Sequence, residues 1–115
     1  MPAGTIAVVD WRGGALPREP NKIRPGIVVE NDALFEDQYP NILVVPLTRD
    51  RTILDAPFVV RIDPTPENGA PAVSWAMAHY VNIVSQQRIR PTASRITDDQ
   101  LWDIRQRIAL AIGLV

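Results

Sequence analysis

Short apolar runs, separated by polar and proline-rich stretches, fill the first three quarters of the chain. Four of these runs are rich in valine and isoleucine, which is typical of buried strands. They cover residues 4–11, 25–30, 42–47 and 58–62. Residues 72–84 alternate only roughly between apolar and polar positions, and two further short segments fit before residue 89. The pattern predicts five or more short strands. Because Pro46 cannot donate to a ladder, the third strand is expected to lie at an edge or a bulge there.

The periodicity changes near the C-terminus. Thr97 stands three residues before Gln100, which is the spacing of a capping box at the start of a helix. The next apolar residues recur every three or four positions and form one helix face. They are Leu101, Ile104, Ile108, Ala111 and Ile112. Gly113 suits the helix end, and Trp102 is expected to pack inside. The whole pattern predicts a mainly β fold, a small barrel with a C-terminal α-helix packed on it.

The length and composition of the chain indicate a single small domain without a metal site or a membrane span. A chain of 115 residues, 46% of them hydrophobic, fits one domain spanning residues 1–115. Without cysteine, and with the single histidine His79, no metal site and no cofactor are expected. No apolar run is long enough to cross a membrane, and the N-terminus lacks the pattern of a signal peptide. We therefore expect a cytoplasmic protein that does not contact a membrane.

The charged residues of the chain are nearly balanced in number, but the basic ones are almost all arginine. The net charge of −1 argues against broad, non-specific binding of nucleic acid. Eleven of the twelve basic residues are nevertheless arginine, whose planar fork of donors matches a phosphate, although genome composition explains such a bias equally well. Residues 18–31 combine charges and prolines with an apolar run, and Arg24 stands where loop becomes strand. Such junctions often carry function, although a solvated surface loop explains the same pattern.

The order of these landmarks resembles one protein family. Arg24-Pro25 opens a valine- and isoleucine-rich strand that ends near Asn31, and a later strand ends in Pro46-Leu47-Thr48. A segment led by Ser74 then runs to Arg88-Ile89, and the last helix ends in Gly-Leu. Together they resemble the MazF/PemK toxins of bacterial toxin–antitoxin pairs. The resemblance implies an SH3-like β-barrel that forms a homodimer and cleaves single-stranded RNA without a metal. It also implies 2′,3′-cyclic phosphate and 5′-hydroxyl products, and an antitoxin with an acidic, disordered tail.

The resemblance also implies catalytic roles. Arg24 matches the family's catalytic arginine and would hold the phosphate, with a structural ion pair as the alternative. Thr48 would donate its hydroxyl to a phosphate oxygen, or simply end its strand. Glu19 lies five residues before Arg24, where some members carry a catalytic glutamate, and would act as base unless it is merely solvated. His79 stands where many members have aspartate, so it is either an acid or base or an ordinary strand histidine.

A second set of residues is expected to bind RNA. Trp11 and Trp75 would stack on bases, although tryptophan in a small barrel more often packs in the core or at a dimer interface. Arg12 would contact a backbone phosphate or be solvated. Three further RNA contacts complete the set: Lys22, Asn31 and Ser74.

Two other functions compete with RNA cleavage. A gyrase poison of the CcdB type uses a tryptophan close to its C-terminus, whereas this chain ends in Ile-Gly-Leu-Val and Trp102 lies well inside the helix. A non-catalytic SH3-like binding module is consistent with the low net charge and with His79. An RNA cleavage assay in EDTA separates the three functions.

Overall fold

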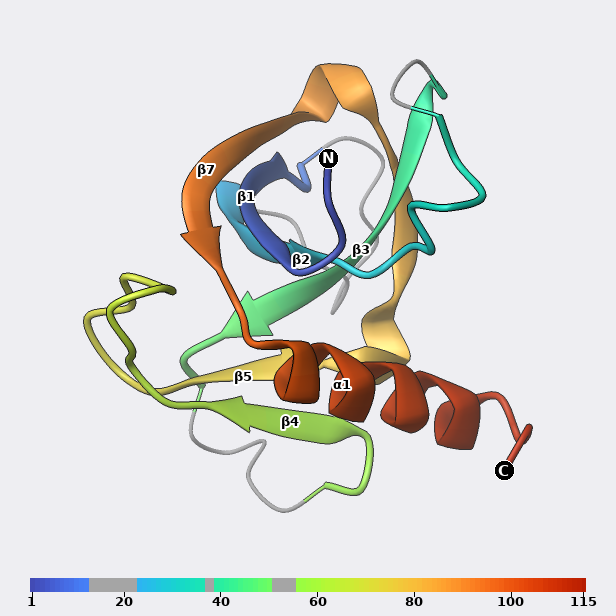
Figure 1. Ribbon diagram of the computed structural model, residues 1–115. Coiled ribbons are helices and arrows are strands. Elements are labelled where there is room, and N and C mark those ends of the chain that lie inside the picture. The colour runs from blue at the N-terminus through green and yellow to red at the C-terminus, as the bar shows by residue number, and fades with distance from the viewer. Residues whose placement is uncertain (13–22, 37–38, 51–55) are drawn as a thin grey trace.

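The computed structural model describes residues 1–12, 23–36, 39–50 and 56–115. Within these ranges the chain forms seven strands and one α-helix, α1 (Asp98–Ala111), with two single-turn 3-10 helices, η2 (Ala78–Tyr80) and η3 (Gln86–Arg88) (Figure 1). The strands are β1 (Thr5–Asp10), β2 (Ile23–Val28), β3 (Asn41–Thr48), β4 (Val59–Ile62), β5 (Ser74–Met77), β6 (Asn82–Ser85) and β7 (Ile89–Arg95). The predicted class, mainly β with a C-terminal helix, is confirmed. No helix in the described part has the length and apolar character needed to span a membrane.

The strands form one antiparallel sheet in the order β4-β5-β3-β2-β1-β7. Strand β3 is central: one edge pairs with β2, and its other edge pairs first with β6 and then with β5. The sheet curls into a barrel-like shape without closing, and α1 covers β4 and β5 (Figure 1). Because neighbours run antiparallel, the starts of β2 and β5 meet the ends of β3 and β4 at one edge of the sheet.

Two features of the strands differ from a simple reading of the sequence. Pro46 lies inside the central strand, opposite Gly26 of β2, and it meets a break in the ladder on the other side of β3 rather than an outer edge of the sheet. Its missing donor is tolerated because it falls between the stretch of β3 that pairs with β6, which ends at Val44, and the stretch that pairs with β5, which begins at Leu47. Strand β7 was not predicted, since five of its seven residues are exposed and its sequence, IRPTASR, lacks an apolar run. The strand forms because its backbone pairs with the edge of β1 that β2 does not occupy.

The core has two parts, one on each face of the sheet. The first lies between the sheet and α1 and includes the fully buried Ile27, Val45 and Ile104. The second includes Val9, Trp11, Val28 and Val44. Gly26 allows β2 to approach this second part closely, because a Cβ atom there would lie 3.1 Å from a Val9 methyl and 3.3 Å from the Trp11 ring.

Helix α1 begins as predicted. The Thr97 hydroxyl accepts from the Gln100 amide (3.1 Å), and the Gln100 side chain accepts from the Thr97 amide (2.9 Å), so both halves of the capping box are present. Gly113 follows the helix with a positive φ of 80°.

The predicted apolar face of α1 is only partly buried. Leu101 and Ile104 are buried, whereas Ala111 and Ile112 are exposed, because the end of the helix extends past the sheet (Figure 1). The expectation that Trp102 packs inside is wrong, since it is 65% exposed. It follows Leu101 directly and therefore lies about 100° around the helix from that buried side chain.

Arg105 fixes α1 to the end of β2. Its Nε donates to the carbonyl oxygen of Val29 (3.1 Å) and its Nη2 to that of Glu30 (2.9 Å), and both accepting residues are buried. We expect Arg105→Ala to lower the free energy of unfolding by about 2 kcal/mol, because it leaves these carbonyls without their charged donor. Urea unfolding measures this. Arg95→Ala is the control, since Arg95 has only an exposed contact with Asp98 at 3.9 Å. Equal losses in both variants would contradict the role of Arg105.

Candidate functional site

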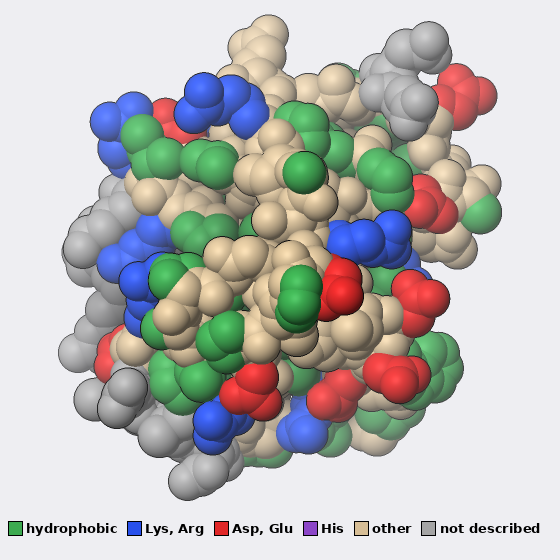
Figure 2. Space-filling view, turned by 60° about the vertical axis from the view of Figure 1, so that its left-hand side comes forward, with side chains coloured by type: hydrophobic (Ala, Val, Ile, Leu, Met, Phe, Trp, Pro, Cys, Tyr) green, Lys and Arg blue, Asp and Glu red, His purple; other side chains and the backbone are tan. Residues whose placement is uncertain are grey.

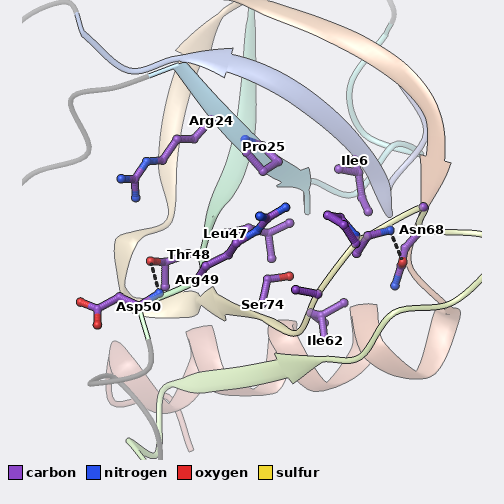
Figure 3. Close-up of a pocket in the computed structure, with 14 residues that line it drawn as sticks. Ile6, Arg24, Pro25, Leu47, Thr48, Arg49, Asp50, Ile62, Asn68 and Ser74 are labelled. Carbon is purple, nitrogen blue, oxygen red and sulfur yellow. Dashed lines mark hydrogen bonds between the residues drawn. The ribbon is translucent and has the colours of Figure 1, made fainter.

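A pocket of about 490 Å³ opens at the sheet edge where the starts of β2 and β5 meet the ends of β3 and β4 (Figure 3). Its walls come from five strands and the loop between β4 and β5, so segments far apart in sequence build one cavity. It is lined by Ile6, Arg24, Pro25, Leu47, Thr48, Arg49, Asp50, Ile62, Asn68, Gly69, Ala70, Pro71, Ala72 and Ser74.

One end of the pocket is polar and positively charged. Arg24 is the second residue of β2, and it lies above Thr48 and Asp50 in Figure 3. Neither the Arg24 side chain nor the Arg49 side chain makes a hydrogen bond or ion pair with another described residue. The Thr48 side chain accepts a hydrogen bond from the Asp50 amide (3.1 Å), which leaves the hydroxyl proton of Thr48 able to donate. Two arginines and a threonine hydroxyl therefore line this end of the pocket.

The other end of the pocket is apolar. Ile6, Pro25, Leu47 and Ile62 line it, and the loop wall adds Ala70, Pro71 and Ala72. In Figure 3 Ile6 and Ile62 lie on the side of the pocket opposite Arg24 and Thr48. The cavity thus joins an end lined by arginines to an end lined by apolar side chains.

Asn68 holds the loop wall in place. It is only 5% exposed, and its side-chain oxygen accepts from the amides of Thr65 (3.0 Å) and Ala70 (2.9 Å). Its side-chain nitrogen donates to the Asp63 carbonyl oxygen (2.8 Å). With these hydrogen bonds, Asn68 stabilises the bend that carries Gly69 at φ 62° and points the following small residues at the pocket.

Residues 3–112 match the family described as PemK-like, MazF-like toxin of type II toxin–antitoxin system. The chain belongs to this family. The family is one of endoribonucleases. A curated relative from Mycolicibacterium smegmatis (strain ATCC 700084 / mc(2)155), named probable endoribonuclease MazF, is 28% identical over 94 residues, which cover 81% of this chain and 83% of the relative.

Solved structures share the fold of this PemK/MazF-family toxin. MazF from Deinococcus radiodurans has a TM-score of 0.79 at 18% identity, covering 98% of this chain and 96% of the other. An endoribonuclease in complex with its cognate antitoxin, from a mycobacterial species, has a TM-score of 0.75 at 20% identity, covering 100% and 98%. These likenesses extend along nearly the whole of each chain.

The pocket brings together three of the residues predicted for the toxin's site: Arg24, Thr48 and Ser74. Thr48 and Ser74 are largely buried, so their hydroxyls are held by the sheet. Their catalytic and RNA-binding roles stay predictions. Glu19 and Lys22 lie outside the described residues.

Arg12 and Asn31 do not line the pocket. Arg12 forms two hydrogen bonds with the Asp10 carboxylate, from Nε (3.0 Å) and Nη2 (2.9 Å). This contact holds the pKa of Asp10 at about 2 and raises the pKa of Arg12. Asn31 is exposed, and its side chain accepts from the Ala33 amide in a local turn. Both residues therefore have local partners in place of an open anion site.

Trp11 and Trp75 do not present their rings to solvent, which counts against the expectation that they stack on bases, although that role stays untested. Each is 5% exposed. Trp11 belongs to the second part of the core, and Trp75 is paired with Thr48 and Arg61 in the middle of the sheet. Packing inside the protein, the alternative to base stacking, fits the burial of both tryptophans.

His79 lies apart from the pocket. It was expected in a strand, but it sits in η2, exposed, with its ring centroid 3.9 Å from that of Phe58 and 4.3 Å from that of Tyr80. It is absent from the pocket lining that holds Arg24. The structure thus places His79 against aromatic rings rather than beside the residues that would hold a phosphate, although its catalytic role itself stays untested.

We expect His79→Gln to cleave RNA at the parent rate. Although His79 is largely exposed, partial burial of its ring lowers its pKa from the ordinary 6.5, so the unfolded chain takes up a proton at a higher pH than the folded protein does. The stability contributed by neutral His79 is present above pH 6.5 and is lost as pH falls below it. The difference in Tm between parent and variant should therefore change between about pH 7.5 and about pH 5.5. A normally melting variant with a large loss of cleavage would instead restore His79 to the catalytic set.

Three polar or charged residues of the pocket were not named as site residues by the sequence analysis: Arg49, Asp50 and Asn68. Arg49 and Asp50 directly follow Thr48, the last residue of a predicted strand. Their position next to a predicted site residue could therefore have marked them as candidates. Asn68 stands before Gly69 in a proline-rich loop, a pattern that predicts a turn but not a pocket wall. Among the described residues no three His, Asp or Glu side chains gather as a metal site.

Proposed function

We propose that this toxin cleaves single-stranded RNA in the pocket that contains Arg24, without a metal ion. The observation that carries the proposal is the cationic end of the cavity, where the Arg24 and Arg49 guanidinium groups have no described partner beside the Thr48 hydroxyl. An RNA phosphate is the anion that such a group of donors fits. The adjoining apolar end would take a base next to that phosphate.

The reaction would be a transfer within the RNA. The 2′-oxygen loses its proton to a base and attacks the neighbouring phosphorus, and the bond from phosphorus to the 5′-oxygen breaks. A proton then goes to the 5′-oxygen, which gives a 2′,3′-cyclic phosphate and a 5′-hydroxyl. Arg24 would stabilise the extra negative charge on the phosphorus oxygens, and Thr48 would donate to one of them. Ser74 would bind the RNA from the facing strand.

Two carboxylates are candidates for the base. Asp50 is the acid of the described pocket lining, but Figure 3 shows its carboxylate turned away from the pocket centre. Glu19 lies five residues before Arg24 in sequence, where some family members carry a catalytic glutamate. We propose Glu19 as the base, with Asp50 as the alternative to be tested.

We further propose that the toxin acts in the cytoplasm as a homodimer and is inhibited by an antitoxin with an acidic, disordered tail. A solved structure of the same fold is an endoribonuclease in complex with its cognate antitoxin. The open guanidinium groups of the pocket suit an acidic peptide as well as RNA. Exposed apolar side chains at the end of α1, among them Leu110, Ile112 and Leu114, favour a dimer that covers them.

The test is cleavage of single-stranded RNA in EDTA, with analysis of both product ends. We expect cyclic phosphate and 5′-hydroxyl ends, inhibition by an added cognate antitoxin, and a dimer mass by light scattering. Trapping of gyrase on DNA without RNA cleavage would favour a gyrase poison, and the absence of both activities would favour a binding module. A monomer mass at micromolar concentration would remove the dimer.

A further inference from the structure

The sheet register places the Arg49 side chain on the face that forms the apolar end of the pocket. Ser74 of β5 is opposite Ile62 of β4. The next residue of β5, Trp75, is opposite Thr48 of β3. Arg49 follows Thr48, so the same antiparallel register carried one residue further sets it opposite Ser74. Because directly opposed residues point to the same face, Arg49 shares a face with Ser74 and Ile62, which both line the pocket.

Arg24 leaves the sheet on the other face. It is opposite Val9 of β1, whose side chain lies in the second part of the core. The next residue, Pro25, points to the opposite face and lines the apolar end of the pocket. In Figure 3 the Arg49 side chain accordingly extends toward the middle of the pocket, whereas the Arg24 side chain points in the opposite direction. A bound ligand would therefore meet the two guanidinium groups at separate points.

No acidic side chain of the described pocket lining engages Arg49. Asp50 is the acid there, and its carboxylate is turned away from the pocket centre (Figure 3). The Arg49 side chain is exposed and makes no hydrogen bond or ion pair with another described residue. Its surroundings in the pocket are the Ser74 hydroxyl and apolar side chains. A planar guanidinium in such a place suits a flat ligand with hydrogen-bond acceptors on its edge.

Among the RNA bases, guanine fits this donor best. One edge of guanine carries two acceptors, O6 and N7, which match the fork of an arginine. Adenine and cytosine each place an amino donor on the corresponding edge, where it would face the guanidinium donors, and uracil offers only O4. Proteins read unpaired RNA bases by hydrogen bonds to such edges while apolar or planar side chains cover the faces.

We propose that Arg49 recognises a guanine next to the cleaved phosphate, by donating to its O6 and N7 atoms. The inference rests on the proposed function, because the guanine belongs to the RNA whose phosphate is bound by Arg24 and Thr48. The apolar end of the pocket would cover the faces of the base. Arg49 would thus determine the sequence that is cut and take no part in bond breaking.

The first test is cleavage of a randomised pool of single-stranded RNA in EDTA, with sequencing of the product ends. We expect the parent to show guanine enriched at one of the two positions that flank the cleaved bond. Arg49→Gln and Arg49→Lys should each lower this enrichment about tenfold, because neither keeps the fork. Arg61→Gln is the matched control, since Arg61 is bonded to Asp63 outside the pocket, and it should keep the parent preference.

Base analogues then identify the atoms that Arg49 contacts. Inosine keeps O6 and N7, so an RNA with inosine at the selected position should be cut as fast as the guanine RNA. An RNA with 7-deazaguanine lacks the N7 acceptor and should be cut several-fold more slowly by the parent. Arg49→Gln should cut the guanine and 7-deazaguanine RNAs at equal rates, a result that a merely structural role of Arg49 would not produce.

A binding arm keeps the inference separate from the proposed activity. The probes are the 3′- and 5′-monophosphates of guanosine and adenosine, whose Kd is measured by NMR titration. One guanosine monophosphate should bind the parent about tenfold more tightly than its adenosine counterpart, and Arg49→Gln should bind both equally. If the parent cuts no RNA, the proposed function fails, and this arm still decides whether Arg49 selects guanine.

Several results would overturn the role of Arg49. The absence of a guanine preference in the parent, or the same preference in Arg49→Gln, each excludes the contact with guanine. An equal loss for all four bases would assign Arg49 to a phosphate instead. An unchanged base preference combined with weaker inhibition by the antitoxin would assign it to the antitoxin surface. Thermal melts of the variants check that the pocket edge is intact.

Discussion

Arg24→Ala is expected to lower the rate of RNA cleavage by about 10²- to 10³-fold and to abolish the growth arrest caused by expressing the toxin. The Arg24 guanidinium makes no hydrogen bond or ion pair with described residues, so its loss removes a phosphate donor without breaking a structural contact. Its backbone stays in β2, opposite Val9. The melting temperature should therefore remain close to that of the parent.

The control for this prediction is Arg61→Ala. Arg61 is also a strand arginine, but its side chain is bonded to Asp63 (2.9 Å) and does not line the pocket. This variant should stay toxic and cleave RNA at nearly the parent rate. An Arg24→Ala protein that folds and remains as toxic as the parent would show that the pocket is not the active site.

Glu19→Gln is expected to lower the cleavage rate by about 10²- to 10⁴-fold, the usual contribution of a general base. The 2′-hydroxyl must lose its proton before attack, and a carboxylate with an ordinary pKa of about 4.3 accepts it once ionised. The acidic limb of the pH–rate profile should therefore disappear in the variant. Single-turnover cleavage measured from about pH 4 to about pH 9 provides the profile.

Asp50→Asn separates the two carboxylates. Asp50 lines the pocket, but its carboxylate is turned away from the centre, so we expect the variant to retain its rate within a few-fold (Figure 3). Its backbone amide, which donates to the Thr48 hydroxyl, is unaffected by the substitution. The opposite result, with Glu19→Gln active and Asp50→Asn inactive, would make Asp50 the base.

The sequence alone determined those helices and strands that depend on interactions between residues close together in the chain. The capping box at Thr97 depends on groups three residues apart, and the first four strands depend on runs of β-branched side chains. The order of landmarks also pointed to Arg24 and Thr48, which the fold places in one pocket. A site at the end of a strand could be predicted because strand ends are visible in the sequence.

Only the tertiary structure decided which polar groups are engaged. Whether an arginine side chain is bonded depends on strand register and on acids brought near by folding, so Arg12, which is bonded to Asp10, and Arg24, which has no described side-chain partner, cannot be told apart from the sequence. The same is true of the buried tryptophans and of His79, whose neighbour Phe58 is remote in sequence. The pocket wall held by Asn68 joins the site only because antiparallel pairing brings the ends of β3 and β4 to the starts of β2 and β5.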